Sequence, residues 1–486
     1  MLLTNKLKNM DARKISCDCI IVGAGSAGIE AYKTAKQNGA QCILVESGPL
    51  GTTAHRTGDI PSCLLFAAGK AAHTNADAEK FGLKFKNKAS FDKSNVLNSL
   101  RASRAQSTTE VLSFLYKIPD DERIIGKAGF IDAHHVHVGE NLIIEFKTAV
   151  IATGSTPVIP YELGKLGGIL TTDDFFETDR IKNSVAVFGS GLVGLRLGQA
   201  LSYLGVDVTV FCDENLWLLT DETVIAKTRE LLRKSMKLSV NSNITSIEKH
   251  GDLYGIYYLD ENNFENFITV EQIISAGSRY PKIDGMKLRD IGIKLSPFGF
   301  IDVDEKTLQT SIPHIFAAGD VIGHKMSTNL AKETGRVAGF NAANLPHKLE
   351  MNSSVAVHVL PTEPAAAIVG LSFNEVKERA KLGFHFVIGE SHADKGIYRC
   401  EHTAQGLIRL YCDLQNHCIL GAEMCAPQCD HLAHFLALAI QKKMTADELS
   451  TFSFFHLTYE EALNDAAKAA VKAINQRKGT NYYARS

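Results

Sequence analysis

The alternation of apolar and polar positions predicts two similar units, each made of a strand, a glycine-rich turn, a helix and a second strand. The first reads "CDCIIVGAGSAGIEAYKTAKQNGAQCILVES" and the second, later in the chain, "SVAVFGSGLVGLRLGQALSYLGVDVTVFCDE". In both, a short apolar run precedes the glycines and a helical stretch follows them, which is typical of a βαβ unit. Because the two strands of such a unit run in the same direction, the pattern predicts two parallel sheets.

The rest of the chain predicts a different arrangement. A long polar helix is expected near 91–116, short strands lead from it to "AVIATGSTP", and "SIPHIFAAGD" predicts another buried strand. From about residue 351 the pattern alternates, as in "GLIRLYCDLQNHCILGAEM", which favours an antiparallel sheet followed by helices at 429–442 and 459–477. The predicted fold class is therefore α/β, with two Rossmann-like dinucleotide-binding domains and a C-terminal α+β domain.

The first glycine turn has the spacing of a phosphate-binding loop. Gly23 permits the tight turn, Gly25 lets the backbone approach a pyrophosphate, and Gly28 lets the helix pack on the strand. The start of the following helix presents free N–H groups to the phosphates. Glu46 closes the second strand, where a carboxylate would accept hydrogen bonds from ribose hydroxyls.

The second glycine turn repeats this spacing with Gly189, Gly191 and Gly194. Cys212 stands in the usual acidic position after the second strand, and Asp213 follows it. No arginine or lysine occurs from 212 to 224, so a 2′-phosphate would lack a counter-charge there. This absence favours NAD over NADP.

One such turn alone is weak support for a nucleotide site, because a glycine-rich turn without a ligand has the same sequence. Two turns, each between a strand and a helix, argue against a chance match. A chain with two dinucleotide sites is predicted to bind a flavin dinucleotide, FAD, and a nicotinamide dinucleotide, NAD, and to move hydride between them.

Composition narrows the class of protein without adding a site. The 486 residues are 45% hydrophobic and 22% charged with a net charge of −2, which argues against a dedicated nucleic-acid-binding face. No apolar run is long enough to cross a bilayer, and the N-terminus lacks the pattern of a signal peptide. Ten scattered cysteines without a Cys-x-x-Cys motif indicate reduced thiols, so we expect a cytoplasmic protein with no nucleic-acid or membrane partner.

A series of short motifs also follows one known family in order and spacing. The series comprises "VGAGSAG", "IATGS", "GSGLVG", "SAGSRYP", "AAGD", "TEP" and "HLTYEE". Over residues 15–478 the chain resembles the FAD-dependent pyridine nucleotide–disulfide oxidoreductases of class I, closest to dihydrolipoamide dehydrogenase and its relatives, mercuric reductase and soluble transhydrogenase.

The resemblance implies four regions and a homodimer. They are the first part of an FAD-binding domain at 1–154, an NAD-binding domain at 155–276, a central domain at 277–350 that completes the FAD site, and a C-terminal dimerisation domain at 351–486. One subunit of such a dimer lends a His–Glu pair to the active site of its partner.

The resemblance also implies roles for single residues at the cofactors. Asp320 would bond the ribityl chain of the flavin, the backbone near Thr328 would meet the isoalloxazine, and Ala128 would touch the adenine. Three further cofactor-binding positions fall in the shared motifs, namely Thr153, Gly154 and Gly277.

His456 and Glu461 match the pair that is lent to the partner subunit. A carboxylate that orients an imidazole makes it a competent proton acceptor near neutral pH. The alternative is a histidine that packs or caps at the start of the final helix.

The redox disulfide of the family is missing. Ala54 takes the place of the outer cysteine and Asp59 that of the cysteine facing the flavin, and no cysteine occurs between Cys42 and Cys63. Thiol–disulfide exchange requires a thiolate that attacks a sulfur, so an alanine and a carboxylate cannot replace the pair. Lipoamide reduction through an internal dithiol is therefore not expected.

Two neighbouring positions also depart from the family. Cys63 replaces a lysine near flavin N5, and Arg196 in "GLRLG" replaces the glutamate that pairs with this lysine. The positive charge beside the flavin would then come from Arg196 and would stabilise an electron-rich flavin. Cys63 would be either a reactive thiol of lowered pKa or a small inert thiol in the space left by the lysine.

Two other clusters have residue types that bind metals. His135 and His137 lie on one face of a short strand, where core or surface histidines are favoured over ligands. The second cluster comprises Cys425, Cys429, His431 and His434. Its spacing fits zinc sites poorly, so we expect no metal site.

Together these observations favour a homodimeric FAD enzyme in which NADH supplies hydride and electrons leave directly for a small-molecule acceptor. Candidate acceptors are a quinone, oxygen, a second nicotinamide, and an external disulfide or metal ion that approaches from the side of His456. Two alternatives stay open at this stage. One is a transhydrogenase-like enzyme, and the other is a flavoprotein that kept its cofactors as a sensor or structural partner and lost catalysis.

Overall fold

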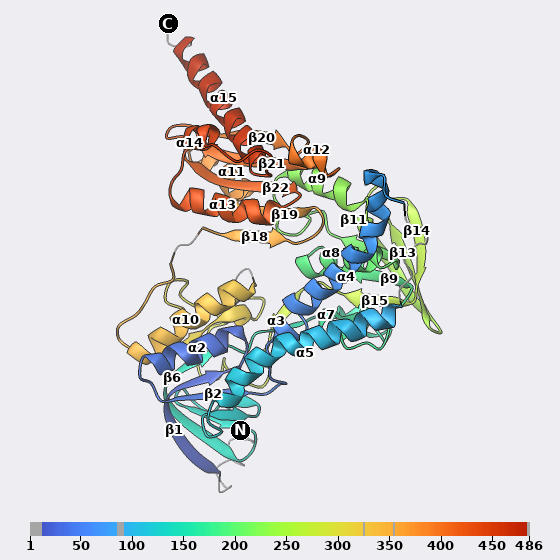
Figure 1. Ribbon diagram of the computed structural model, residues 1–486. Coiled ribbons are helices and arrows are strands. Elements are labelled where there is room, and N and C mark those ends of the chain that lie inside the picture. Colours follow the sequence, from blue (N-terminus) through green and yellow to red (C-terminus); the bar gives the residue numbers. More distant parts are fainter. Residues whose placement is uncertain (1–11, 85–91, 324–325, 353–354, 484–486) are drawn as a thin grey trace.

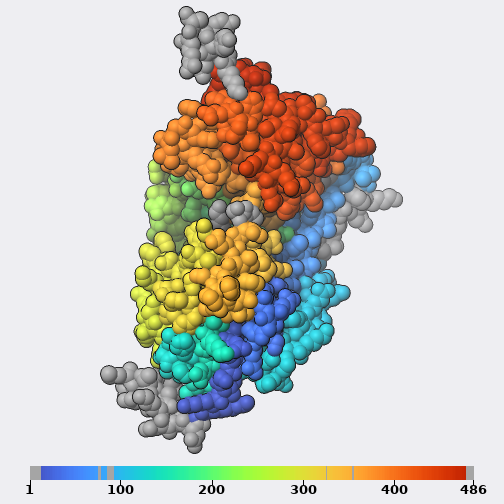
Figure 2. All heavy atoms as spheres, turned by 90° about the vertical axis from the view of Figure 1, so that its left-hand side faces the viewer, coloured from blue at the N-terminus to red at the C-terminus, as the bar shows by residue number. Residues whose placement is uncertain are grey.

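The computed structural model describes residues 12–84, 92–323, 326–352 and 355–483. The molecule is elongated, with the C-terminal sheet at one end, the N-terminal strand at the other and the second glycine-containing unit to one side (Figure 1). A view turned by 90° shows the same order from the C-terminal part to the first strands (Figure 2).

The first predicted unit lies at the centre of a mostly parallel sheet. In spatial order its strands are β3 (Arg123–Ile125), β2 (Cys42–Glu46), β1 (Arg13–Val22), β6 (Leu142–Ile151), β5 (His135–Val138) and β4 (Ala128–Phe130), and β17 (Ile315–Ala317) also pairs with β6. The run Cys19–Val22 is apolar without alternation because both faces of β1 are covered. The strand predicted in "SIPHIFAAGD" is β17, so a late segment of the chain completes the first sheet.

Two helices cover one face of this sheet side by side: α2 (Ser26–Gln37) and α10 (Thr328–Asn344) (Figure 1). A Cβ at Gly335 would lie 2.1 Å from the carbonyl oxygen of Ala27, and one at Gly339 would lie 2.3 Å from that of Ala31. These pairings show that the helices run parallel. Both N-termini therefore point toward the carboxyl edge of the parallel strands.

The second predicted unit forms a parallel sheet of its own. In spatial order its strands are β11 (Lys237–Val240), β10 (Asp207–Cys212), β9 (Ser184–Phe188), β15 (Gln272–Ser275) and β8 (Leu170–Thr171). The other elements of this unit are α7 (Thr172–Phe175), α8 (Leu192–Tyr203), α9 (Glu222–Leu232) and the antiparallel strands β12 (Asn243–His250), β13 (Leu253–Leu259) and β14 (Glu265–Val270). The prediction of two parallel sheets is confirmed, with antiparallel β4 and β5 added to the first.

Helices between the two units join them. They are α3 (Thr53–Arg56), α4 (Asp59–Asp77), a 3-10 turn η1 (Ala78–Phe81) and α5 (Lys93–Lys117), which is the predicted polar helix. α4 packs closely on α8, because a Cβ at Gly69 would lie only 2.7 Å from the carbonyl oxygen of Ala200. Short elements complete the connections, namely β7 (Ser155–Pro157), α6 (Tyr161–Gly164), β16 (Arg279–Pro281) and the 3-10 turn η2 (Gly319–Ile322).

The alternating C-terminal region forms the predicted antiparallel sheet. In spatial order its strands are β18 (Val357–Leu360), β19 (Ala365–Gly370), β22 (Ile419–Ala426), β21 (Leu407–Asp413) and β20 (Phe386–His392). Its helices are α11 (Phe373–Lys381), α12 (Ile397–Cys400), α13 (Cys429–Gln441), α14 (Ala446–Thr451) and α15 (Glu461–Tyr483). The predicted helices 429–442 and 459–477 are α13 and α15, and α15 continues beyond the predicted end.

A buried carboxylate, that of Glu423, joins the C-terminal sheet to the second unit. Glu423 of β22 is 0% exposed and accepts hydrogen bonds from the backbone N–H groups of Thr220 at 2.8 Å, Asp221 at 2.9 Å and Phe373 at 2.9 Å. The hydroxyl of Thr220 donates to the same carboxylate at 2.5 Å. Because this buried charge has four donors, it holds the start of α9 against β22 rather than weakening the core.

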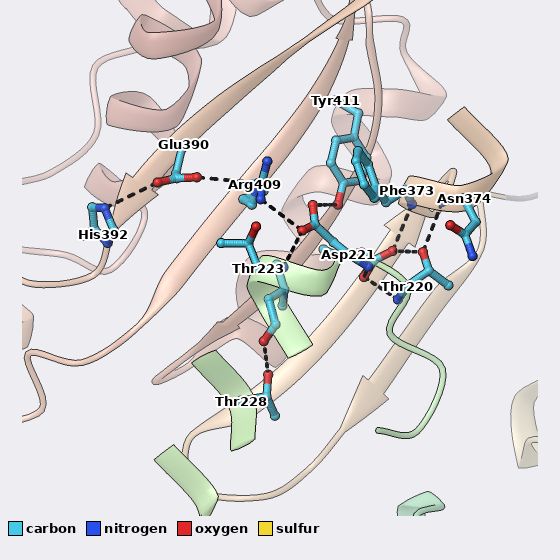
Figure 3. A network of polar contacts seen from close by, with 12 residues as sticks. Thr220, Asp221, Thr223, Thr228, Phe373, Asn374, Glu390, His392, Arg409 and Tyr411 are labelled. Carbon is cyan, nitrogen blue, oxygen red and sulfur yellow. Dashed lines mark hydrogen bonds and ion pairs between the residues drawn. The ribbon is translucent and has the colours of Figure 1, made fainter. Parts of the chain in front are cut away.

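A second buried carboxylate, Asp221, caps the N-terminus of α9 beside the first. It accepts hydrogen bonds from the Arg409 guanidinium at 3.0 Å and from the Tyr411 hydroxyl at 2.9 Å (Figure 3). Burial and the nearby charges of Glu423 and Asp221 raise the pKa of Tyr411, so its hydroxyl remains a donor. The second unit is thus fixed to the C-terminal sheet by a satisfied polar network.

Candidate functional site

The first glycine turn has a backbone that accepts no other residue at two of its three glycines. Gly23 has φ +109°, and a Cβ there would lie 2.3 Å from the carbonyl oxygen of Ala152. A Cβ at Gly28 would lie 1.7 Å from the carbonyl oxygen of Gly23. Gly25, in contrast, faces open space at the N-terminus of α2, where a phosphate group would be received by free N–H groups.

Glu46 lies at the carboxyl end of β2, beside this turn. Its Oε2 accepts a hydrogen bond from Ala24 N at 2.7 Å, and its Oε1 accepts from Ser47 N at 2.8 Å and Gly48 N at 2.7 Å. These bonds hold the carboxylate at the wall of the cavity beside the glycine turn.

Two adjoining cavities lie beside the turn, and they share the lining residues Glu46, Thr153 and Lys282. The smaller, of about 170 Å³, is lined by Ala128. The larger, of about 510 Å³, is lined by four other predicted positions, Gly25, Gly154, Asp320 and Thr328, whereas Gly28 lines neither cavity. The structure therefore brings together the residues predicted for FAD on both sides of the turn.

The chemistry of the lining fits FAD. The Oγ1 atom of Thr153 is buried without a hydrogen-bond partner in the described part of the chain, so a polar ligand group would satisfy it. Asp320 accepts a hydrogen bond from Ser155 Oγ at 2.8 Å, which orients its carboxylate at the cavity. An adenine at Ala128, phosphates at Gly25 and a ring system toward Thr328 would use the cavities from end to end.

The second glycine turn repeats the backbone contacts of the first. Gly189 has φ +144°, and a Cβ there would lie 2.3 Å from the carbonyl oxygen of Ala276. A Cβ at Gly194 would lie 2.4 Å from the carbonyl oxygen of Gly189, whereas Gly191 and Gly277 face open space. This arrangement fits a second dinucleotide over the N-terminus of α8.

The two units differ at the acidic position. Burial raises the pKa of the Cys212 thiol to about 12, so it is uncharged near pH 7. Asp213 supplies the carboxylate one residue later and accepts a hydrogen bond from Ser190 Oγ at 3.1 Å. The stretch 212–224 contains no arginine or lysine, but a cation reaches it from further along the chain. Arg229 of α9 donates a hydrogen bond to the carbonyl oxygen of Glu214.

His456 and Glu461 form the predicted pair. Nδ1 of His456 lies 3.0 Å from Oε1 of Glu461, and this contact with His456 lowers the pKa of Glu461. The His456 side chain is 75% exposed and lines a separate cavity of about 410 Å³ with Lys395 and Lys468. This cavity shares no lining residue with the larger cavity beside the first glycine turn of the same chain.

Comparison with known proteins decides which family has this arrangement. Residues 17–335 match the pyridine nucleotide-disulphide oxidoreductases, and residues 356–467 match the dimerisation domain of the same group. The chain belongs to this family. It is an FAD-dependent oxidoreductase whose second dinucleotide is NAD(H).

Similar proteins cover almost the whole chain. Dihydrolipoyl dehydrogenase of Geobacillus stearothermophilus is 28% identical over 94% of this chain and 97% of its own. Mercuric reductase of Staphylococcus aureus is 27% identical over 94% of this chain and 83% of its own. The Cu(II) complex of the HOCl-induced flavoprotein disulfide reductase RclA from Escherichia coli has the same fold, with a TM-score of 0.79 at 19% identity, over 93% of this chain and 99% of that one.

The segment without cysteines forms part of the wall of the larger cavity. Ala54 lies on α3 and Asp59 begins α4, and both line the larger FAD cavity. The hydroxyl of Thr328 donates to Asp59 Oδ2 at 2.5 Å. No cysteine is among the residues described as lining this cavity.

Cys63 and Arg196 lie on the packed helices α4 and α8. Cys63 is exposed, and the Arg196 guanidinium lies over the Phe66 ring at 5.4 Å. The Nε atom of Arg196 is buried without a hydrogen-bond partner in the described residues. The structure brings Arg196 to α4, and a direct effect of Arg196 on Cys63 stays a prediction.

The two other clusters are dispersed. His135 and His137 do share one face of β5, where Nδ1 of His135 lies 2.9 Å from Asp132. Cys425 and Cys429 are buried, while the His431 side chain is 76% exposed on α13. Among the described residues, no group of three or more ligand side chains is placed to hold a metal ion.

The described helices include none that is both long and apolar enough to cross a membrane.

Proposed function

We propose that this protein is an NADH:acceptor oxidoreductase that transfers electrons to a small molecule without an internal disulfide. When bound, FAD supplies the capacity to accept hydride from NADH and to give up the electrons again. The observation that carries the proposal is the wall of the larger cavity, where Ala54 and Asp59 stand in place of sulfur. Because a disulfide relay needs two sulfurs, electrons must leave the cavity directly.

Residues of the first unit would hold FAD. Gly25 and the N-terminus of α2 would receive the pyrophosphate, and Glu46 would accept from a ribose hydroxyl. Asp320 would orient the ribityl chain, Ala128 would contact the adenine, and Thr328 would lie beside the ring system.

Residues of the second unit would hold NADH. Gly191 and Gly277 would leave room for the dinucleotide, and the N-terminus of α8 would receive its phosphates. Asp213 would accept a hydrogen bond from a hydroxyl of the adenosine ribose. Support for these roles comes from the repeated geometry of the two turns.

His456 and Glu461 would act in a homodimer. Their exposed cavity lies apart from the FAD cavity of the same chain, so a partner subunit is needed to bring them to a flavin. There Glu461 would orient the imidazole and His456 would exchange protons with the acceptor. The same proposal includes domain boundaries at 154, 276 and 350. It also includes a cytoplasmic location of the protein, in which its ten cysteines would stay reduced.

Anaerobic mixing of the purified protein with NADH tests the function. We expect the flavin absorbance to bleach and to return when a quinone, oxygen, an external disulfide or a metal ion is added, and that screen identifies the acceptor. Dihydrolipoamide with NAD should give no appreciable turnover. A flavin that NADH leaves oxidised, or brisk turnover of dihydrolipoamide, would contradict the proposal.

A transhydrogenase-like activity is the second candidate, and Arg229 is the observation that favours it. Its guanidinium reaches the segment after β10, where a 2′-phosphate would need a cation. Rapid bleaching by NADPH as well as NADH, followed by hydride return to an NADP analogue, would support it.

A further inference from the structure

The segment from Thr52 to Asp59 forms one wall of the larger FAD cavity, and every residue in it except His55 lines that cavity. Asp59 lies in the first turn of α4, and Thr328 lies in the first turn of α10. The Thr328 hydroxyl donates to Asp59 Oδ2 at 2.5 Å, so the bond joins two helix starts across the cavity wall. The side chain that replaces a sulfur is thus a positioned carboxylate.

The position of Asp59 along the FAD site follows from the cavities. Ala128 lines only the smaller cavity, Glu46 lines both cavities, and Gly25 lines only the larger one. With the adenine assigned to Ala128 and the phosphates to Gly25, the remaining part of the larger cavity is left for the ring system. Asp59 and Thr328 line this larger cavity and not the smaller one.

One oxygen of the Asp59 carboxylate is open to solvent. Its side chain is exposed, and within the described residues its second oxygen, Oδ1, receives no hydrogen bond. A carboxylate with one oxygen fixed and the other open is placed to take a proton from water and to pass it to a bound molecule.

His55 lies behind this wall as a second titratable group. Its Nδ1 lies 2.9 Å from the hydroxyl of Thr52, and its neighbours by charge are Lys332 of α10, Asp59 of α4 and Glu110 of α5. Burial and then the charge of Lys332 lower the pKa of His55, so its imidazole is neutral near pH 7 and can accept a proton.

We propose that Asp59, positioned by Thr328, delivers solvent protons to the electron acceptor, and that this acceptor is a neutral molecule of the quinone class. The inference rests on the proposed function. The net reaction is NADH + H⁺ + quinone → NAD⁺ + hydroquinone. The C4–H bond of the dihydronicotinamide breaks and two O–H bonds form on the quinone. One of these O–H bonds takes the hydrogen that the dihydronicotinamide lost, which His456 of the partner subunit would pass on as a proton. The other takes the additional proton, which enters from water through Asp59.

Three of the other candidate acceptors fit this wall less well. A second nicotinamide takes a hydride and needs no proton donor. An external disulfide would release a thiolate beside a carboxylate, and like charges repel at close range. The described residues hold no cluster of ligands for a metal ion. A quinone needs both the electrons and the protons that this site can supply.

Asp59→Asn tests the step, because asparagine keeps the size and an acceptor for Thr328 but cannot carry a proton. Two acceptors separate electron transfer from proton transfer: 2-methyl-1,4-naphthoquinone takes protons, and ferricyanide takes single electrons without protons. We expect the variant to lose about 10²–10⁴-fold in flavin reoxidation by the quinone, which is the range of general acid catalysis. Reoxidation by ferricyanide should change less than about two-fold, and a solvent deuterium effect should appear only with the quinone.

Bleaching by NADH is measured first in each variant, so failure of the proposed function is recognised separately. Thr328→Val, which removes the hydroxyl that holds Asp59, should slow the quinone reaction less than Asp59→Asn. Glu222→Gln is the matched control, because Glu222 occupies the first turn of α9 and should alter neither reaction. Equal losses with both acceptors, an unchanged quinone rate in Asp59→Asn, or reoxidation of the native protein that is faster with oxygen than with the quinone would overturn the inference.

Discussion

The two glycine turns of this protein have the same backbone and different neighbours. In each, a glycine at positive φ lies against an alanine carbonyl, Ala152 or Ala276, and the middle glycine faces open space. The first turn is followed by Glu46, whose carboxylate is fixed by three backbone N–H groups, whereas the second is followed by buried Cys212 and exposed Asp213. From this comparison we expect the turn to determine that a dinucleotide binds, and the residues after the second strand to determine which dinucleotide binds and how tightly.

Filling the open position of each turn should separate the two cofactors most sharply. Gly25→Val and Gly191→Val place a side chain where the protein leaves space, so the fold should survive and the phosphates should be excluded. We expect Gly25→Val to be purified without flavin absorbance. Gly191→Val should keep the flavin and lose bleaching by NADH.

Gly164→Val is the control for these variants, since a Cβ there meets only Ile159 at 3.9 Å. It should retain flavin and NADH bleaching. If Gly25→Val kept its flavin, or if both turn variants lost it, the assignment of one dinucleotide to each turn would be wrong.

The second unit differs from the first in being held to the C-terminal sheet by Glu423. Glu423→Gln replaces a carboxylate that receives four donors by an amide with one accepting oxygen, so we expect the free energy of unfolding of this unit to fall by about 2–4 kcal/mol. Trp217, the single tryptophan of the chain, lies in this unit and reports its urea transition by fluorescence.

The matched control comes from the same network. Glu390 approaches Arg409 at 3.5 Å and its side chain is 40% exposed, so Glu390→Gln should cost less than about 1 kcal/mol. Flavin absorbance, followed in the same titration, should change at lower urea in Glu423→Gln only if the two units unfold together. Equal stability of both variants would show that the buried carboxylate contributes little to this junction.

Glu46 and Asp213 provide a smaller contrast between the units. In Glu46→Gln the amide cannot accept at both ends, so one or two backbone N–H groups lose their acceptor and we expect the Kd for FAD to rise about 10–100-fold. Asp213→Asn should raise the KM for NADH only about three-fold, because this residue is exposed and has one side-chain partner, Ser190. Flavin release by dilution and steady-state kinetics measure the two effects, and a larger effect at Asp213 would contradict the contrast.

Much of this architecture could be predicted from the sequence because it depends on local rules. The strand–glycine–helix pattern gave both parallel sheets, and the alternation after residue 351 gave the antiparallel sheet. The position of β17 was also predictable as a strand, although its partner β6 was not, since strand pairing depends on contacts far apart in the chain.

The site was less predictable where it depends on side chains from different elements. The loss of sulfur at Ala54 and Asp59 was evident from the family spacing, but the bond from Thr328 to Asp59 joins residues that no local pattern connects. The polar network around Glu423 and Asp221 was missed for the same reason. Arg229 was not predicted because it lies beyond residue 224 in the sequence. The helix α9 brings its side chain back to Glu214, in the segment that follows β10.

Arg229 offers the finest test of the difference between the turns. If its guanidinium lies beside the adenosine ribose, it should attract a 2′-phosphate, while Asp213 should repel one, so NADPH should be a weak but measurable reductant. Arg229→Leu should lower kcat/KM for NADPH about three- to ten-fold, as expected for loss of a partly exposed charge pair, and leave NADH within about two-fold. Arg379→Leu is the control, because it removes an exposed positive charge from α11 in the C-terminal region and should alter neither. Equal losses for NADH and NADPH would instead assign Arg229 to holding the loop through Glu214, and the choice of nucleotide would then depend on Asp213 alone.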